Sequence, residues 1–460
     1  MHLFRCSNMK RRRGQSSDSD KLAENWSFFD ESPDELVFEI LIRLPREAAV
    51  LCKAVCKRWC ALISDGDYFI TRFIHHRHHL LEADRPFSLV VQTNFLSVRP
   101  LPAQSERMIL VQIISQKLFK GKLYEGIVDM RFIPCVQRPL PFQPMMHGPL
   151  EFQLEASCAD LLLCSYNNPS TSLTVYHICN MVTRQWVALP PIRMDSKAAD
   201  VGFLYDPVTC SVCNQGHTQS EFNALYNYRL VRIPLCRLFR VRIHSKLKIQ
   251  IFSSKEGRWT NSVVPLPRSL RTRFGKSRMI AYNRMLHMLT DGGVIVFDPF
   301  RETQQVSRII DLPVLSIPML ISSNICLGTS WGQLRLSIMS GEGADSALDV
   351  WELEDYKNGK WCMAYKISTQ NLVFRGIKFN SDFCCCEVLA FHPNNRNIIY
   401  LGISKYQAQY VVQCDMQQKN RLKVLYQPKH LRGMCGGRLS WVNTFALVHH
   451  SWPTPMLSLA

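Results

Sequence analysis

The sequence predicts an α+β chain in two parts, a small N-terminal helical domain followed by a much larger all-β domain. Residues 32–69 carry dense helix start and stop signals with apolar side chains at helical spacing. After about residue 85 the helical spacing fades. Short runs rich in Val, Ile, Leu, Tyr and Phe then alternate with Gly, Pro, Asn and Asp, the pattern of many short strands. We predict a disordered basic tail at 1–26, a helical domain at 27–80 and a β domain at 87–460.

The first helix is predicted to begin at Ser32 and to end before Pro45. Ser32 is a capping residue with Glu35 as its capping-box partner, and Pro33 suits the first helical position. Pro45 ends the helix because a residue before proline is pushed out of the helical region. The apolar positions recur along two neighbouring lines of one face: Leu36, Ile40 and Leu44, and Val37 and Leu41.

A second apolar run predicts further helix. The run consists of Val50, Leu51, Ala54, Val55, Trp59, Leu62 and Ile63. One helical face is expected to hold Val55, Trp59, Leu62 and Ile63. Gly66 interrupts this run, and Asp67 is placed to cap a short helix that carries Phe69 and Phe73. A unit of about 45 residues cannot bury so much apolar surface by itself. Some of it is therefore expected to face a partner or the rest of the chain.

The order of these residues resembles the F-box family. The matching positions are Pro33, Leu36, Ile40, Leu41, Leu44, Pro45, Val55, Cys56, Lys57, Arg58, Trp59 and Phe69, and the chain departs at Ser32, where the family usually has leucine. The resemblance implies docking on a Skp-type adaptor, which binds a cullin scaffold. By resemblance, the adaptor-binding positions are Pro33, Leu36, Ile40, Leu44, Val55 and Trp59. The alternative is an ordinary local core, which we expect for Leu41, Leu62 and Ile63.

The β domain contains a loose repeat. Its five units span residues 161–191, 247–267, 285–313, 334–367 and 398–427, and most can be divided into three strands. Trp186, Trp259 and Trp361 fall near the same place in the third strand, with Val306 and Val424 near it in the other units. Such a shared position favours a structural role in packing one sheet on the next.

This repeat looks like a kelch-like β-propeller, similar to the F-box-associated regions of plant F-box proteins. Radial blades protect the exposed edges of many short strands. The paired glycines of kelch repeats are mostly absent, with Gly292-Gly293 and Gly436-Gly437 as partial exceptions. Residues 87–135 are a candidate for a sixth unit. The alternative architecture is a pair of packed β-sandwiches.

Positive charge is concentrated in one segment. Residues 228–284 hold fifteen Lys and Arg and one acid, whereas the whole chain has a net charge of +18. Such a segment attracts acidic partners, and the candidate contacts are Arg240, Arg242, Lys246, Lys248, Arg271 and Arg273. The alternative is a solvated face balanced by the acidic stretch at 342–355. Nucleic acid is not expected as a partner, because these basic residues alternate with apolar ones as in a half-buried strand.

Composition limits the compartment. No apolar run approaches the roughly 18 residues of a membrane span, so no membrane partner is expected. The N-terminus lacks the pattern of a secretory signal, so the 18 cysteines are expected to be reduced thiols. These observations predict a cytoplasmic or nuclear protein. The basic cluster at 10–13 matches an import signal only loosely, and a solvated tail is the alternative.

No enzyme, metal or cofactor motif emerges from the sequence. Cys210, Cys213 and His217 have metal-like spacing but lack a fourth ligand. The cysteines at 384–386 alternate in direction along a strand, and the histidines at 75–79 suit a solvated linker. No nucleophile elbow, phosphate loop or zincin motif is present. We therefore expect a non-enzyme without cofactor or metal.

The resulting hypothesis is a substrate receptor of an SCF-type cullin ubiquitin ligase. In it the helical domain binds the adaptor and the β domain binds an unknown target protein. The alternative is an interaction module outside any ligase, which recognises an acidic partner through residues 228–284.

Overall fold

The computed structural model divides the chain into two compact units, residues 1–76 and 77–460, and each unit is described by itself. The structure describes residues 32–44, 46–64, 68–69, 72–73, 87–96, 107–116, 123–126, 151–168, 171–181, 183, 185–193, 198–207, 226–235, 242–272, 279–290, 292–301, 306–314, 325–340, 347–368, 372–374, 377–378, 383–405, 408–418, 422–426 and 438–448. The predicted tail at 1–26 lies outside these residues. The predicted extents of the domains remain predictions.

The helical unit contains α2 (Asp34–Arg43), α3 (Arg46–Cys52) and α4 (Lys57–Ser64). The second apolar run forms two helices, not one continuous face, because the chain turns at 53–56. There the N–H groups of Lys53 and Ala54 donate to carbonyls three residues back, at 3.2 and 3.0 Å, which tightens the end of α3. Helix α4 then begins with the Trp59 N–H donating to the sulfur of Cys56 at 3.4 Å.

Aromatic rings fill the core of this unit. Phe38 packs edge-on against Phe69 with 5.3 Å between ring centroids, and Phe69 stacks on Phe73 at 5.8 Å. Leu41 and Ile63 are fully buried beside them. None of the helices that the structure describes is both long and apolar enough to cross a membrane.

The second unit is built from small antiparallel sheets. The first sheet combines β1 (Phe87–Leu96), β2 (Arg107–Gln116) and β3 (Leu123–Gly126) with β27 (Arg438–Val448) from the C-terminal part of the chain. The second sheet contains β4 (Glu151–Cys158), β5 (Leu161–Asn168), β6 (Leu173–Asn180), β7 (Gln185–Ala188) and β8 (Ile192–Arg193). The third sheet contains β9 (Ala198–Pro207), β10 (Tyr226–Leu235), β11 (Arg242–Ser253) and β12 (Arg258–Thr272).

Three further sheets follow in the second half of this unit. Their strands are β13 (Met279–Tyr282), β14 (Met285–Thr290), β15 (Gly293–Phe297) and β16 (Val306–Ile310); β17 (Ile325–Ser330), β18 (Gln333–Ser340), β19 (Ala347–Asp355) and β20 (Lys360–Ser368); and β23 (Phe383–Phe391), β24 (Ile398–Lys405), β25 (Ala408–Asp415) and β26 (Leu422–Tyr426). A short pair, β21 (Val373–Phe374) and β22 (Ile377–Lys378), precedes the last sheet.

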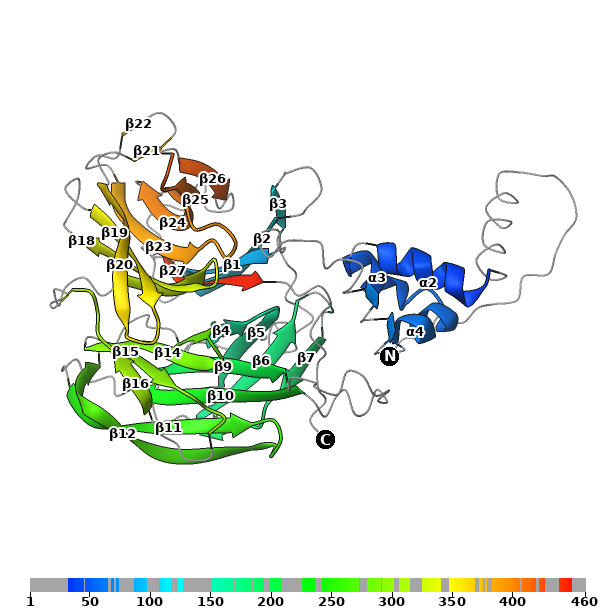
Figure 1. Cartoon of the computed structure of the whole chain (residues 1–460), viewed down its shortest axis with the longest axis horizontal. Helices are drawn as coiled ribbons and strands as arrows, with labels where there is room; N and C mark the ends of the chain where they lie inside the picture. Colours follow the sequence, from blue (N-terminus) through cyan, green and yellow to red (C-terminus); the bar gives the residue numbers. More distant parts are fainter. Residues whose placement is uncertain are drawn as a thin grey trace, which may run out of the picture. The chain divides into compact units, whose positions relative to one another are not determined.

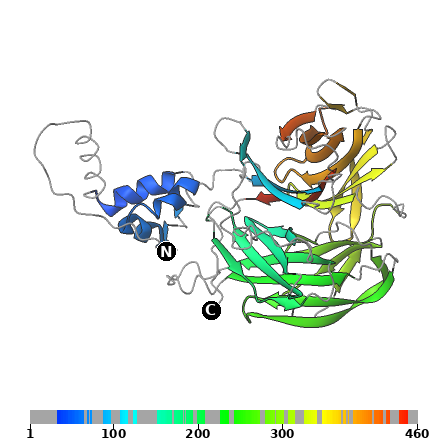
Figure 2. The ribbon, with the colours of Figure 1, turned by 180° about the vertical axis from the view of Figure 1, so that it is seen from behind.

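Within the described residues, the six sheets of four or five strands are blades arranged in a ring (Figures 1 and 2). The innermost strands of the blades contact one another in the cyclic order β4, β9, β13, β17, β23, β27 and back to β4. The ring closes because β27, from the C-terminal part of the chain, pairs with β1 from the start of the domain. The β-propeller prediction is therefore confirmed, and the alternative of packed β-sandwiches is excluded.

The repeat found in the sequence corresponds to the outer strands of each blade. The unit at 285–313 is β14–β16, and the unit at 334–367 is β18–β20. The candidate sixth unit at 87–135 supplies β1, β2 and β3 of the closing blade. In four blades the innermost strand, β4, β13, β17 or β23, lies just before the repeat unit, so the repeat alone did not reveal it.

The repeated tryptophans tie neighbouring blades together. The indole N–H of Trp259 in β12 donates to the Pro190 carbonyl at 2.8 Å, and that of Trp361 in β20 donates to the Asp311 carbonyl at 2.8 Å. Both acceptors lie just beyond the outer strands of the preceding blade. The predicted packing role thus describes these two residues, whereas Trp186 in β7 is 38% exposed and its ring lies tilted against that of His177.

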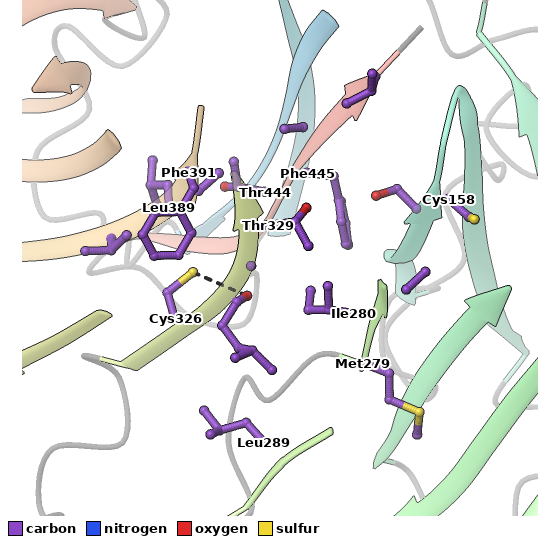
Figure 3. A pocket seen from close by; sticks show the side chains of 18 of the residues that line it. Cys158, Met279, Ile280, Leu289, Cys326, Thr329, Leu389, Phe391, Thr444 and Phe445 are labelled. Atoms are coloured by element: carbon purple, nitrogen blue, oxygen red, sulfur yellow. Dashed lines mark hydrogen bonds between the residues drawn. The ribbon is translucent and has the colours of Figure 1, made fainter. Parts of the chain in front are cut away.

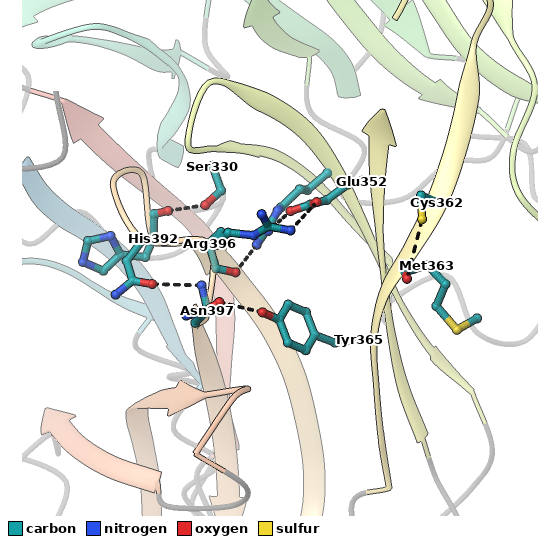
Figure 4. Close-up of polar contacts among 10 residues, drawn as sticks. Ser330, Glu352, Cys362, Met363, Tyr365, His392, Arg396 and Asn397 are labelled. Atoms are coloured by element: carbon teal, nitrogen blue, oxygen red, sulfur yellow. Dashed lines mark hydrogen bonds and ion pairs between the residues drawn. The ribbon is translucent and has the colours of Figure 1, made fainter. Parts of the chain in front are cut away.

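A buried charge network joins the last two blades (Figure 4). Arg335 of β18 has no exposed side-chain surface and forms an ion pair with Glu352 of β19. The same guanidinium donates to the carbonyl of Arg396, and the side chain of Arg396 reaches Glu352 at 3.2 Å. The hydroxyl of Tyr365 donates to the side-chain oxygen of Asn397 at 2.6 Å. These contacts fix the turn between β23 and β24 against the neighbouring blade.

Two buried histidines should make the propeller sensitive to acid. Burial lowers the pKa of His287 and of His392, each to about 4. An unfolded histidine titrates near 6.5, so between pH ~6.5 and ~4 the unfolded chain binds more protons than the folded one. We expect the free energy of unfolding to decrease as the pH is lowered through this window, by up to about 1.4 kcal/mol per pH unit for each histidine.

Urea unfolding followed across this pH range measures the effect. Replacing His287 with Phe should lessen the dependence on pH, because a phenyl ring takes up no proton. An identical pH dependence in the wild type and the His287→Phe variant would contradict the assignment.

Candidate functional site

Helix α2 carries two distinct apolar faces. Val37, Leu41 and Ile42 point into the core and are buried. Leu36 and Ile40 lie on the adjacent face and keep 54% and 42% of their surface exposed. Since four residues make just over one helical turn, these two exposed side chains stand one above the other.

An arginine from α4 fixes the start of α2. The Nε of Arg58 donates to the Asp34 carboxylate at 2.7 Å, and a guanidinium nitrogen of Arg58 donates to the carbonyl of Ser32. The expected Ser32 cap was wrong: Pro33 occupies the capping position with extended backbone and no side-chain cap. The contact with Arg58 holds the chain extended at this point, so the helix begins at Asp34.

Other apolar side chains are exposed on the same unit. Leu51 at the end of α3 is 72% exposed, Val55 in the following turn is 48% exposed, and Tyr68 is also exposed. We call Leu36, Ile40, Leu51 and Val55 the exposed apolar set. Single exposed leucines are ordinary, but several large ones within one small unit are typical of a protein interface.

The predicted adaptor-binding residues divide between this surface and its support. Pro33, Leu36, Ile40 and Val55 are exposed, whereas Leu44 and Trp59 are half-buried. Leu41 and Ile63, expected in the core, are fully buried, and Leu62 is partly exposed. Leu51 was missed as a surface residue, because the sequence alone did not show that α3 ends at the next residue. The role of these residues in binding remains a prediction.

The candidate basic contacts are only partly described. Lys246 and Lys248 are exposed on β11. Arg242 and Arg271 belong to β11 and β12 by their backbone, while Arg240 and Arg273 lie outside the described residues.

The candidate metal ligands from the sequence are also only partly described. Cys210, Cys213 and His217, like the histidines at 75–79, lie outside the described residues. The cysteines at 384–386 lie in β23, where Cys385 pairs with Ser404 and Cys386 with Ile403. Within the described ranges no three His, Cys, Asp or Glu side chains gather closely enough to hold a metal.

A cavity of about 210 Å³ lies between the innermost strands of the propeller (Figure 3). Its lining is mostly apolar, with Phe391 and Phe445 among the larger side chains, and the hydroxyl of Thr329 adds polarity. Glu387 is the one carboxylate among its described lining residues. Burial raises the pKa of the Cys158 thiol in this lining to about 11, so this thiol is protonated at neutral pH.

The helical unit and the propeller together define an F-box protein with a C-terminal β-propeller. Residues 33–75 match the family described as F-box-like. Residues 141–445 match the family described as "F-box protein At3g26010-like, beta-propeller", and the chain belongs to this family.

Two relatives from Arabidopsis thaliana are similar along most of their length. F-box/kelch-repeat protein At1g15680 is 24% identical over 387 residues, which cover 81% of this chain and 79% of the relative. F-box protein At5g49610 is 24% identical over 352 residues, which cover 73% of this chain and 79% of the relative. The resemblance stated from the sequence is therefore confirmed for both parts of the chain.

Proposed function

We propose that this chain is the substrate receptor of an SCF-type cullin ubiquitin ligase. The helical unit binds a Skp-type adaptor, which connects it to the cullin, and the propeller holds the protein to be modified. The observation that carries this proposal is the exposed apolar set on an F-box-like unit, since burying these side chains requires a partner.

In this proposal the chain is not itself an enzyme. It acts by holding the target near the ubiquitin-transfer site, which raises the effective concentration of the two reacting groups. We propose that the chain acts in the cytoplasm or the nucleus. The cysteines that the structure describes are free thiols, which suits either compartment.

The proposal is tested by affinity purification of the full chain and of a chain that lacks residues 1–76. These residues form a compact unit separate from the propeller, so their removal should leave the propeller folded. We expect the full chain to recover the Skp-type adaptor and cullin together with target proteins. The shortened chain should recover the targets alone.

Recovery of equal amounts of adaptor by the shortened chain would contradict the proposal. Its folding is checked by circular dichroism and by a cooperative thermal transition, so that a loss of adaptor is not mistaken for a loss of structure.

A further inference from the structure

The hairpin of β11 and β12 presents one uncovered face. These strands span 12 and 15 residues, against 8, 8 and 4 for β5, β6 and β7 of the preceding blade. Lys246 pairs with Pro265 and Lys248 pairs with Val263, so all four side chains lie on one side of the hairpin. We call these four residues the hairpin face. All are exposed, Val263 to 56%.

The same side of the sheet is covered further along the hairpin. There Phe252 and Trp259 pack against Tyr176 of the preceding blade, with Phe252 fully buried. A row of hydrogen bonds marks the boundary of this packed part: Arg232 donates to Gln250, and Gln250 donates to Asn261 at 3.1 Å. The hairpin face begins one residue pair beyond this row.

The opposite side of the hairpin packs on the next blade. Leu247, Ile249, Val264 and Leu266 belong to one apolar cluster with side chains of that blade. Strand β12 accordingly runs beside β16 (Figure 1). One side of the hairpin is thus used for folding, and the hairpin face on the other side is in contact with solvent.

In the described part of the acidic stretch, residues 347–355, no carboxylate forms an ion pair with this face. Asp349 faces Lys366 at 3.6 Å, and Glu352 is held by Arg335 and Arg396. Other cations of the basic segment have acidic neighbours: Arg229 and Arg258 with Glu256, and Arg268 with Asp311. Lys246 and Lys248, by contrast, form no ion pair with any residue that the structure describes.

We propose that the hairpin face binds an extended acidic segment of the target protein. The assignment of this segment to a ligase target rests on the proposed function. Alternate residues of a strand lie about 6.6–6.8 Å apart, so glutamates at every second position of the segment match Lys246 and Lys248. The methylene groups of these glutamates cover Val263 and Pro265. The segment binds through side chains, because Pro265 and Pro267 remove N–H donors from this edge strand.

A protein segment fits this face better than a nucleic acid does. Single-stranded nucleic acids are held by aromatic side chains on which their bases stack. The hairpin face offers an aliphatic side chain and a proline between its lysines, and no aromatic ring.

The test is fluorescence anisotropy of the full chain with a labelled peptide of four Glu-Thr repeats. We expect saturable binding that weakens when salt is raised from about 0.05 M to about 0.5 M, because exposed charges are screened. A peptide of four Gln-Thr repeats should bind at least about tenfold more weakly, since it keeps the shape and loses the charge. An unlabelled oligothymidylate should not displace the labelled acidic peptide.

The variant Lys246→Glu/Lys248→Glu should bind the acidic peptide about tenfold more weakly, because two attractions become repulsions. The control variant Lys255→Glu/Lys423→Glu makes the same change of charge at exposed positions outside the hairpin face, in the β11–β12 turn and on β26, and should bind like the wild type. Equal weakening in both variants, equal binding of both peptides, or displacement of the acidic peptide by the oligothymidylate would overturn the proposal.

These outcomes are separable from those of the proposed function. Both lysine variants should still bind the Skp-type adaptor, because their substitutions lie outside the helical unit. Loss of peptide binding with adaptor binding intact contradicts only the role of the hairpin face. Absence of adaptor binding in the wild type contradicts only the ligase assignment.

Discussion

Replacing Ile40 with Asp is expected to abolish binding of the Skp-type adaptor while the chain stays folded. Ile40 is 42% exposed on α2, so a carboxylate at this position remains in water in the free chain. In the complex the same carboxylate would be buried against the partner without a counter-charge. Burying an unpaired charge costs several kcal/mol, and the loss of a central interface residue typically costs about 2 kcal/mol or more. Together these effects weaken binding by at least about a hundredfold.

Co-purification of the adaptor with the variant measures this effect. Val263→Asp is the matched control, because it makes the same kind of change at an exposed aliphatic residue of the propeller. Leu44 is a poorer choice, since it is half-buried and its substitution would also disturb the helical unit. A folded Ile40→Asp variant that retains the adaptor would contradict the predicted role of this face.

Replacing Glu352 with Ala is expected to cause a large loss of stability in the propeller. The change leaves the fully buried guanidinium of Arg335 without its carboxylate. Removing one partner of a buried ion pair typically costs about 3–5 kcal/mol. Urea unfolding followed by circular dichroism at β-sheet wavelengths measures this loss.

A neighbouring carboxylate provides the control. Asp349 lies on the same strand but faces Lys366, whose side chain is mostly exposed, so Asp349→Ala should cost about 1 kcal/mol or less. The double variant Arg335→Met/Glu352→Leu should recover much of the stability, because apolar pairs replace buried ion pairs at little cost. Equal losses for Glu352→Ala and Asp349→Ala would contradict the importance of the buried pair.

Local signals predicted the helical unit well. These signals depend only on residues close together in the sequence. They are Pro45, the spacing of Val37 and Leu41, and the pair Phe69 and Phe73. The start of α2 was misjudged because Arg58 holds Asp34, a contact across 24 positions of the sequence. No pattern within the first helix records that contact.

The propeller was predicted from its outer strands. The repeat units at 285–313, 334–367 and 398–427 correspond to β14–β16, β18–β20 and β24–β26. The innermost strands escaped notice, since short segments such as 279–282 owe their extended form to the strands beside them. The pairing of β1 with β27 joins opposite ends of the domain, and no local pattern could predict it.

The candidate sites show the same limit. The family resemblance selected Leu36 and Ile40, and the structure explains why they differ from Leu41 by placing them on the side of α2 that faces away from the core. The hairpin face could not be separated from the rest of the basic segment by sequence. That separation depends on which acids pair with which cations across different blades.

The most direct test of the central claim is a calorimetric titration of the full chain with a purified Skp-type adaptor. We predict a one-to-one complex with a dissociation constant of about 1 μM or tighter, equivalent to about 8 kcal/mol. Leu36→Asp should remove the heat of binding. Absence of binding by the folded wild-type chain at about a hundred times that concentration would contradict the assignment as a ligase receptor.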